Sequence, residues 1–120
     1  MEKQISYINN ELTVNEHKLI FDYDVAQYRC DGEQVFVRLE IPTGIKLTRS
    51  AVRNVFAISR TGQIIWRLPI PVLKEFPKFS PLPITSIFLK DEALFATDFM
   101  GRIFRLNKNT GEGKIVGATK

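Results

Sequence analysis

The chain has 120 residues, of which 44% are hydrophobic and 25% charged, a composition that is typical of a soluble globular domain and argues against a disordered protein. The apolar runs are far shorter than the roughly 20 residues of a membrane-spanning helix, and residues 1–4 lack the apolar core of a signal peptide. The single cysteine excludes an internal disulfide. We therefore expect a cytoplasmic protein without a membrane segment.

The net charge of +4 is unevenly distributed along the chain. Residues 1–33 carry seven acidic and three basic side chains, a net charge of −4, so the remainder carries +8. Between Ile41 and Lys74 lie six basic residues and no acidic one. Such a block either attracts an anionic partner, a nucleic acid or an acidic protein surface, or is balanced by the acidic N-terminal residues folded beside it.

The N-terminal residues are expected to form short strands. Ile5–Ile8 and Leu12–Val14 flank Asn9-Asn10, a pair that tolerates the positive φ angles of a tight hairpin turn. Lys18–Tyr23 and Val25–Cys30 are rich in β-branched and aromatic residues, which favours two further strands. We expect the hairpin and these strands to belong to the first of two sheets.

Residues Gln34–Ile41 alternate in character with a period of two, which predicts a strand with one buried face. Valine, leucine and isoleucine occupy one face, and the other is mainly polar but includes Phe36. Pro42 interrupts strand hydrogen bonding, and residues 43–53 then form a long polar connection. Because loops carried by a rigid sheet often hold binding residues, this connection is a candidate interaction site.

The segment Asn54–Leu68 recurs 39 residues later, without a gap, as Leu94–Leu106. Aligned on Gly62 and Gly101, the two copies share Phe56 with Phe95, Ala57 with Ala96, and Ile64 with Ile103. A strand, a glycine turn and a second strand that recur at this spacing are typical of a β-propeller blade. We therefore expect a two-blade repeat.

Five of the six prolines lie between Pro69 and Pro83, which predicts an extended crossover over 69–83. After it, strands are expected over Thr85–Lys90, Ala93–Asp98, Arg102–Leu106 and Lys114–Val116. We predict a single all-β domain over 1–120 without a sizeable helix. Its two antiparallel meander sheets, 1–68 with the N-terminal hairpin and 84–117, are expected to form a half β-propeller.

The segments Ala57–Trp66 and Ala96–Phe104 resemble the blade repeat of quinoprotein-type propellers, Ala-x-Asp-x-x-Gly-x-x-x-Trp. The first copy has the motif's glycine and tryptophan, Gly62 and Trp66, but a serine in place of its aspartate. The second has the aspartate and the glycine but an arginine in place of the tryptophan. Full propellers of that group hold a pyrroloquinoline quinone cofactor on the ring axis. Two blades form no ring, so we expect no cofactor.

The chain also resembles small bacterial half-propeller proteins that act as immunity partners of secreted toxins, including those of contact-dependent growth inhibition systems. The resemblance lies in the size of the chain, the two blade repeats and the cytoplasmic character. It implies a cytoplasmic bacterial protein that binds a toxin domain.

Side chains that support catalysis or metal binding are scarce. His17 and Cys30 are the only residues of their types, too few for a zinc site of histidines and cysteines. The chain contains neither a phosphate-binding glycine motif nor a Gly-x-Ser-x-Gly motif. Asp22 and Asp24 form either a carboxylate pair or a solvated corner. We expect a non-enzyme with no catalytic, cofactor-binding or metal-binding residues.

The leading hypothesis is an immunity protein that occludes the active site of a cognate toxin. Its predicted partner-binding residues are basic: Lys46, Arg49, Arg53, Arg60 and Arg67. Trp66 is either an exposed aromatic anchor or a core residue. One alternative is a nucleic-acid-binding module that uses the basic region 41–74 and stacks bases on Phe36, Phe99 and Phe104. Another is a homodimer that completes the half-propeller through exposed sheet edges.

Overall fold

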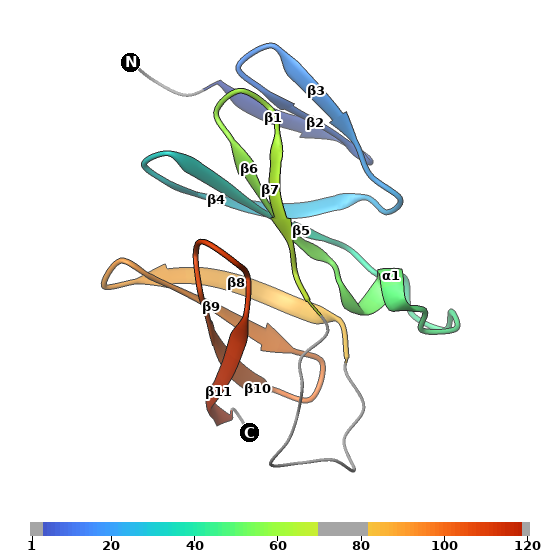
Figure 1. Ribbon diagram of the computed structural model, residues 1–120. Coiled ribbons are helices and arrows are strands. Elements are labelled where there is room, and N and C mark those ends of the chain that lie inside the picture. Colours follow the sequence, from blue (N-terminus) through green and yellow to red (C-terminus); the bar gives the residue numbers. More distant parts are fainter. Residues whose placement is uncertain (1–3, 70–81, 119–120) are drawn as a thin grey trace.

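The computed structural model describes residues 4–69 and 82–118, and in these ranges the chain is all-β, as predicted (Figure 1). The strands form three antiparallel sheets, which we name the N-terminal, central and C-terminal sheets. The one helix of the described ranges, α1 (Arg49–Val52), has four residues. Of the predicted crossover over 69–83, residues 70–81 lie outside the described residues.

The N-terminal sheet contains β1 (Ile5–Ile8), β2 (Glu11–Val14) and β3 (His17–Ile20) in that order. The predicted hairpin turn is confirmed, with a φ of 53° at Asn9. Asn15 and Glu16 also adopt positive φ, 47° and 80°, and form a second tight turn that pairs β3 with β2. The expectation of only two sheets is therefore wrong. The sequence pattern missed the extra sheet because a glutamate rarely adopts this conformation.

The central sheet has the order β4 (Val25–Asp31), β5 (Gln34–Leu39), β6 (Val55–Ser59) and β7 (Ile64–Arg67). The C-terminal sheet has the order β8 (Ile84–Lys90), β9 (Ala93–Asp98), β10 (Arg102–Leu106) and β11 (Gly113–Ala118). Each is a four-stranded antiparallel meander, as expected for the two repeats. Their arrangement as two propeller blades stays a prediction.

The two repeats close with the same turn. The Gly62 N–H donates to the Ser59 carbonyl at 3.0 Å, and the Gly101 N–H donates to the Asp98 carbonyl at 2.9 Å. Both glycines have a positive φ, 79° and 80°, a conformation that costs a residue with a side chain more than it costs glycine. The glycine turns predicted at Gly62 and Gly101 are thus confirmed.

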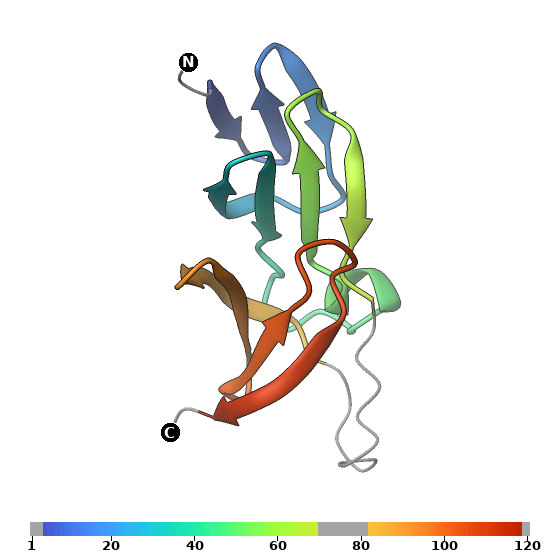
Figure 2. The ribbon, with the colours of Figure 1, turned by 60° about the vertical axis from the view of Figure 1, so that its left-hand side comes forward.

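The central sheet is the middle of three layers (Figures 1 and 2). One hydrophobic core lies between it and the N-terminal sheet, and Leu12 and Val14 contribute to it from β2. A second core lies between the central and C-terminal sheets, where Trp66 packs with Leu94 and Phe104. Each face of the central sheet therefore contributes to a core.

Strand β5 shows the consequence of this middle position. Val35, Val37 and Leu39 belong to the core on the N-terminal side, whereas Phe36 belongs to the core on the C-terminal side. All four side chains are fully buried. The expectation of one buried face is therefore wrong, because the strand lies between two other layers.

Two side-chain amides join the central sheet to the edge strand β8. The Asn54 Nδ2 donates to the carbonyls of Leu39 and Ile84, both at 2.8 Å, and its Oδ1 accepts the Ile84 N–H at 2.9 Å. The Gln27 Oε1 accepts the Ile87 N–H at 2.9 Å, and its Nε2 donates to the Ile87 carbonyl at 3.3 Å. Each amide thus satisfies both backbone groups of one β8 residue, as a neighbouring strand would.

The turn between β10 and β11 is also attached to the central sheet. The Lys108 carbonyl accepts the Trp66 Nε1–H at 2.8 Å and the Gln34 Nε2–H at 2.9 Å. The Lys108 ammonium forms an ion pair with Asp31 at 2.6 Å. Trp66 is only 7% exposed, so the structure places it in the core and not at the surface as an anchor.

Candidate protein-binding surface

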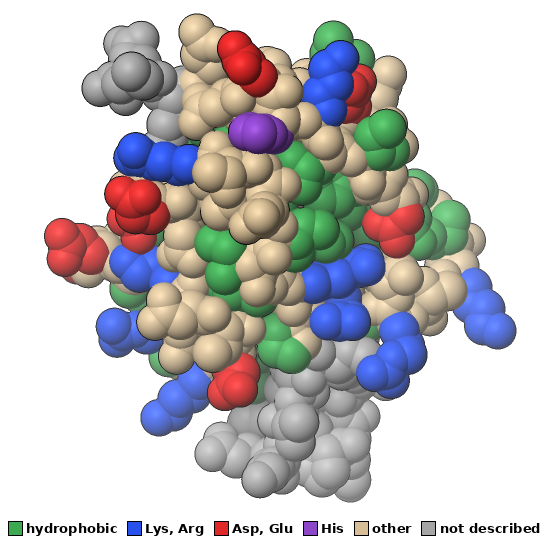
Figure 3. All heavy atoms as spheres, turned by 45° about the horizontal axis from the view of Figure 1, so that its top comes forward, with side chains coloured by type: hydrophobic (Ala, Val, Ile, Leu, Met, Phe, Trp, Pro, Cys, Tyr) green, Lys and Arg blue, Asp and Glu red, His purple; other side chains and the backbone are tan. Residues whose placement is uncertain are grey.

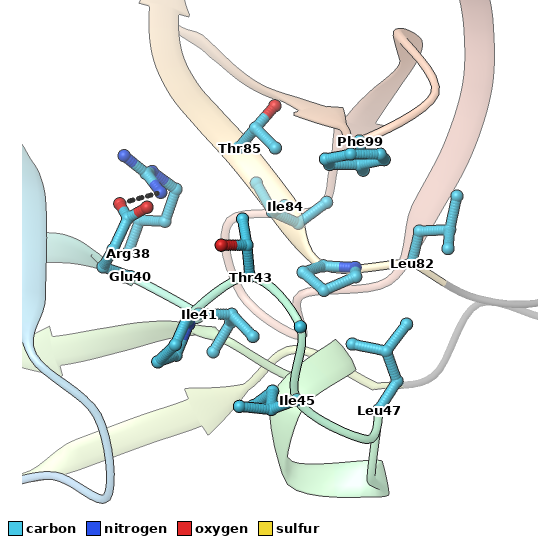
Figure 4. A pocket seen from close by; sticks show the side chains of 13 residues that line it. Arg38, Glu40, Ile41, Thr43, Ile45, Leu47, Leu82, Ile84, Thr85 and Phe99 are labelled. Carbon is cyan, nitrogen blue, oxygen red and sulfur yellow. Dashed lines mark hydrogen bonds and ion pairs between the residues drawn. The ribbon is translucent and has the colours of Figure 1, made fainter.

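A pocket of about 400 Å³ opens at the junction of the central and C-terminal sheets. The segment after β5, the start of β8 and the turn between β9 and β10 form its walls (Figure 4). Its lining is mainly apolar and includes Ile41, Ile45, Leu47, Leu82, Ile84 and Phe99. We call it the apolar pocket.

The segment after β5 is held at both of its ends. At the start, the Glu40 N–H donates to the Asp24 carbonyl at 2.7 Å. At the end, Thr48 caps α1, since its Oγ1 accepts the Ala51 N–H at 3.3 Å. Ala51 and Val52 are buried and anchor this short helix. The loop that carries Ile45 and Leu47 is therefore presented by fixed supports.

Asp98 holds the opposite wall of the apolar pocket. Its carboxylate is nearly fully buried and accepts the N–H groups of Met100 and Arg102, both at 3.0 Å, and the Arg102 Nε–H at 2.6 Å. These bonds fix the turn from which Phe99 and Met100 project. The Phe99 side chain is 69% exposed, although it lies against the pocket.

Exposed apolar side chains surround the apolar pocket. Leu47 and Ile45 are 47% and 39% exposed, and they face Phe99 across the opening (Figure 4). The Arg38–Glu40 ion pair, with 3.4 Å between Nη1 and Oε2, lies at another side of the pocket. A concave apolar site bordered by a few polar groups is the usual form of a binding site.

The structure does not bring the five predicted basic residues into one patch. Lys46 and Arg49 are exposed beside the apolar pocket, and neither side chain makes a hydrogen bond or ion pair within the described residues. Arg60 lies on the β6–β7 turn, at the other end of the central sheet, where it donates to the Gly32 carbonyl at 2.7 Å.

Arg53 and Arg67 bind the protein itself. The Arg53 Nε donates to the Leu68 carbonyl at 2.8 Å, and the Arg67 Nε donates to the Arg53 carbonyl at 2.9 Å. Arg67 also lies 4.8 Å from the centre of the Phe56 ring and forms an ion pair with Asp22 at 3.5 Å. The side chains of Lys46 and Arg49 are therefore more available to a partner than those of Arg53 and Arg67.

We expect charge reversal to separate these two kinds of arginine. Arg53→Glu should lower the free energy of unfolding by about 1–2 kcal/mol, because it removes a partly buried hydrogen bond to Leu68 and places a carboxylate beside that carbonyl. Arg49→Glu, the control, should change stability by less than about 0.5 kcal/mol. Urea unfolding measures both values, and equal effects would contradict the assigned roles.

Acidic residues of the N-terminal part of the chain form ion pairs with basic residues later in the sequence. Asp31 pairs with Lys108, and Glu33 approaches Arg60 to 4.0 Å, so N-terminal acids partly balance later basic residues. Figure 3 brings the N-terminal sheet forward and shows Lys and Arg side chains mainly in the lower half of the view. Part of the basic excess therefore remains at the surface.

The other residues singled out in the sequence occupy ordinary positions. Asp22 pairs with Arg67, and Asp24, His17 and Cys30 are exposed. Among residues 4–69 and 82–118, His, Cys, Asp and Glu form no group of three or more that would suit a metal ion. No helix in the described part of the chain is long and apolar enough to cross a membrane.

Sequence reasoning missed the apolar pocket. Of the three phenylalanines proposed to stack bases, Phe36 and Phe104 are buried in the core, and only Phe99 is exposed. Phe99 was identifiable as a turn residue, but its proximity to Leu47 depends on packing between two sheets. Nothing in the local sequence indicates that proximity.

Fold and site together define a small all-β protein of three stacked antiparallel sheets with an open apolar pocket. The chain belongs to a family described as a domain of unknown function (DUF7957), whose model matches residues 2–117. No curated protein and no solved structure matches the chain.

Proposed function

We propose that the protein is a non-catalytic inhibitor that binds another protein through the apolar pocket, and more specifically that it is an immunity protein that covers the active site of a bacterial toxin. The observation that carries this proposal is the exposed apolar rim formed by Phe99, Leu47 and Ile45 around a concave site. Burying such side chains under a partner releases water from apolar surface.

The surroundings of the apolar pocket indicate the chemistry of the partner. Lys46 and Arg49 extend beside it without partners in the described residues, so an acidic protein surface would complement them. The capped helix and the Asp98 turn hold the two walls in place, which limits the conformational entropy lost on binding. Occlusion requires no catalytic group on this protein.

The test is to capture partners from cytoplasmic and secreted fractions of the native host, purify the protein that co-elutes in stoichiometric amount, and measure its Kd and its activity. The double variant Leu47→Ser/Phe99→Ser should weaken binding about thirtyfold or more, because exposed apolar anchors of an interface often contribute 2 kcal/mol or more. Ile20→Ser is the matched control, since Ile20 is 75% exposed on the N-terminal sheet.

Three outcomes would argue against the proposal. Equal affinity of the wild type and the double variant would move the interface elsewhere. A partner whose activity persists when bound would exclude inhibition. Nucleic acid as the main captured species, released as the salt concentration rises, would favour the basic region as a nucleic-acid site. Homodimerisation is tested separately by sedimentation of the pure protein.

A further inference from the structure

The outer face of the C-terminal sheet, which points away from the central sheet, carries a row of aromatic and basic side chains. Leu94, Ala96 and Phe104 face the core, so their neighbours along β9 and β10 face outward. Strand register places four outward residues side by side across the sheet: Phe88 on β8, Phe95 on β9, Arg105 on β10 and Lys114 on β11. We call these four residues the aromatic–basic row.

The aromatic half of the row is a stacked pair. The rings of Phe88 and Phe95 lie 5.2 Å apart with an angle of 14° between their planes. Both side chains are only partly buried. Among the described residues they belong to neither hydrophobic core, so the packing of the three layers there does not account for them.

The basic half of the row places two like charges side by side. Arg105 and Lys114 are exposed and directly opposite each other on neighbouring strands. Like charges in this position destabilise a sheet, and neither side chain has an acidic partner within the described residues. Lys90, two residues after Phe88 on β8, places a third positive charge at the aromatic end of the row. A bound anion would relieve this repulsion.

We propose that this outer face binds single-stranded nucleic acid, with bases contacting the Phe88–Phe95 pair and phosphates contacting Arg105, Lys114 and Lys90. Aromatic side chains beside a basic track on an open sheet are the elements that single-strand-binding surfaces combine. The outward-facing residues of β8, β9 and β10 in this sheet include no acid. This site is separate from the apolar pocket and goes beyond the inhibitory function.

Two carboxylates limit the affinity of the proposed site. Glu92 and Glu112 line an open depression of about 440 Å³ together with Arg105 and Lys114. They repel a phosphate that approaches the basic end of the row. The double variant Glu92→Gln/Glu112→Gln should therefore bind single strands more tightly than the wild type, an outcome that cannot arise from unfolding.

The experiment is fluorescence anisotropy with labelled oligo(dT) and oligo(U) of about 15 nucleotides, a length that suits a single sheet surface. At low salt, Arg105→Glu/Lys114→Glu should weaken binding at least tenfold, and the slope of log Kd against log salt should fall by about 0.7 for each phosphate that the variant no longer binds. Phe95→Leu retains an apolar side chain but should still weaken binding about fivefold to tenfold.

The control is Lys46→Glu/Arg49→Glu, which makes the same change of charge beside the apolar pocket and should alter oligonucleotide binding much less. Absence of binding at low salt, or an equal loss of affinity in the control and the row variants, would overturn the proposal. So would a dimer that Phe95→Leu dissociates, since this face would then bind a second copy of the chain. None of these results bears on partner binding at the apolar pocket.

Discussion

Replacing Asn54 with leucine is expected to lower the free energy of unfolding by about 4 kcal/mol, a large part of the 5–15 kcal/mol that stabilises a typical domain. Asn54 is fully buried and makes three hydrogen bonds, to the carbonyls of Leu39 and Ile84 and from the Ile84 N–H. Leucine has a similar size but leaves all three backbone groups without this partner in the interior, and each such group costs about 1–3 kcal/mol.

Urea unfolding followed by far-UV circular dichroism measures this effect. Asn109→Leu is the matched control, because Asn109 is exposed in the turn before β11 and should change stability by less than about 0.5 kcal/mol. A loss of stability below about 1 kcal/mol for Asn54→Leu would mean that water or other groups replace the bonds and that the amide does not hold the two sheets together.

Gly111→Ala is expected to be the second most damaging change, with a loss of stability of about 3 kcal/mol. A Cβ at this position would lie 2.6 Å from Cε3 of the Trp66 ring. The indole has little freedom to move away, because its Nε1–H is bound to the Lys108 carbonyl and the ring lies in the core. A positive φ of 80° adds backbone strain.

Gly44→Ala separates the two contributions to this loss of stability. Gly44 has nearly the same φ, 82°, but a Cβ there would meet nothing within 4 Å. Gly44→Ala should therefore lower the free energy of unfolding only through the strained backbone conformation, by about 1 kcal/mol. Thermal unfolding of both variants gives the difference. Similar destabilisation by the two alanines would show that the Trp66 ring moves aside and that its contact with residue 111 contributes little.

The positions of many strands could be predicted because their sequence signals are local. The ranges expected for β9 and β10, Ala93–Asp98 and Arg102–Leu106, are those of the structure. Between β8 and β9, Asp91 and Glu92 fill the two-residue gap between the expected strands as a tight turn, with φ of 51° and 66°. In these segments short apolar runs of strand length are bounded by turn-forming residues, so no long-range information is needed to locate the elements.

Layering was harder to predict than strand position. Phe36 occurs among polar residues, and an alternating pattern then suggests one solvent-facing side. The structure buries this face because the C-terminal sheet covers it, with Phe36 and Trp66 6.1 Å apart between ring centres. The neighbour that buries a face comes from a distant part of the chain, which strand periodicity does not reveal.

The candidate site was predictable only in part, for a similar reason. The loop after β5 could be selected as a binding loop from its length and position. The roles of Arg53 in this loop and of Arg67 on β7 could not, because both donate to backbone carbonyls, which every sequence contains. Likewise, the row from Phe88 to Lys114 exists only once the register of four strands is known.

The position of Asn54 has a consequence for the speed of recognition. The Asn54 amide joins Leu39, the last residue of β5, to Ile84, the first residue of β8. The segments that line the apolar pocket adjoin these two residues. The walls are thus tied together before any partner arrives, and association requires no prior opening. The observed association rate should rise linearly with partner concentration and reach no plateau, so that related partners differ mainly in how slowly they dissociate.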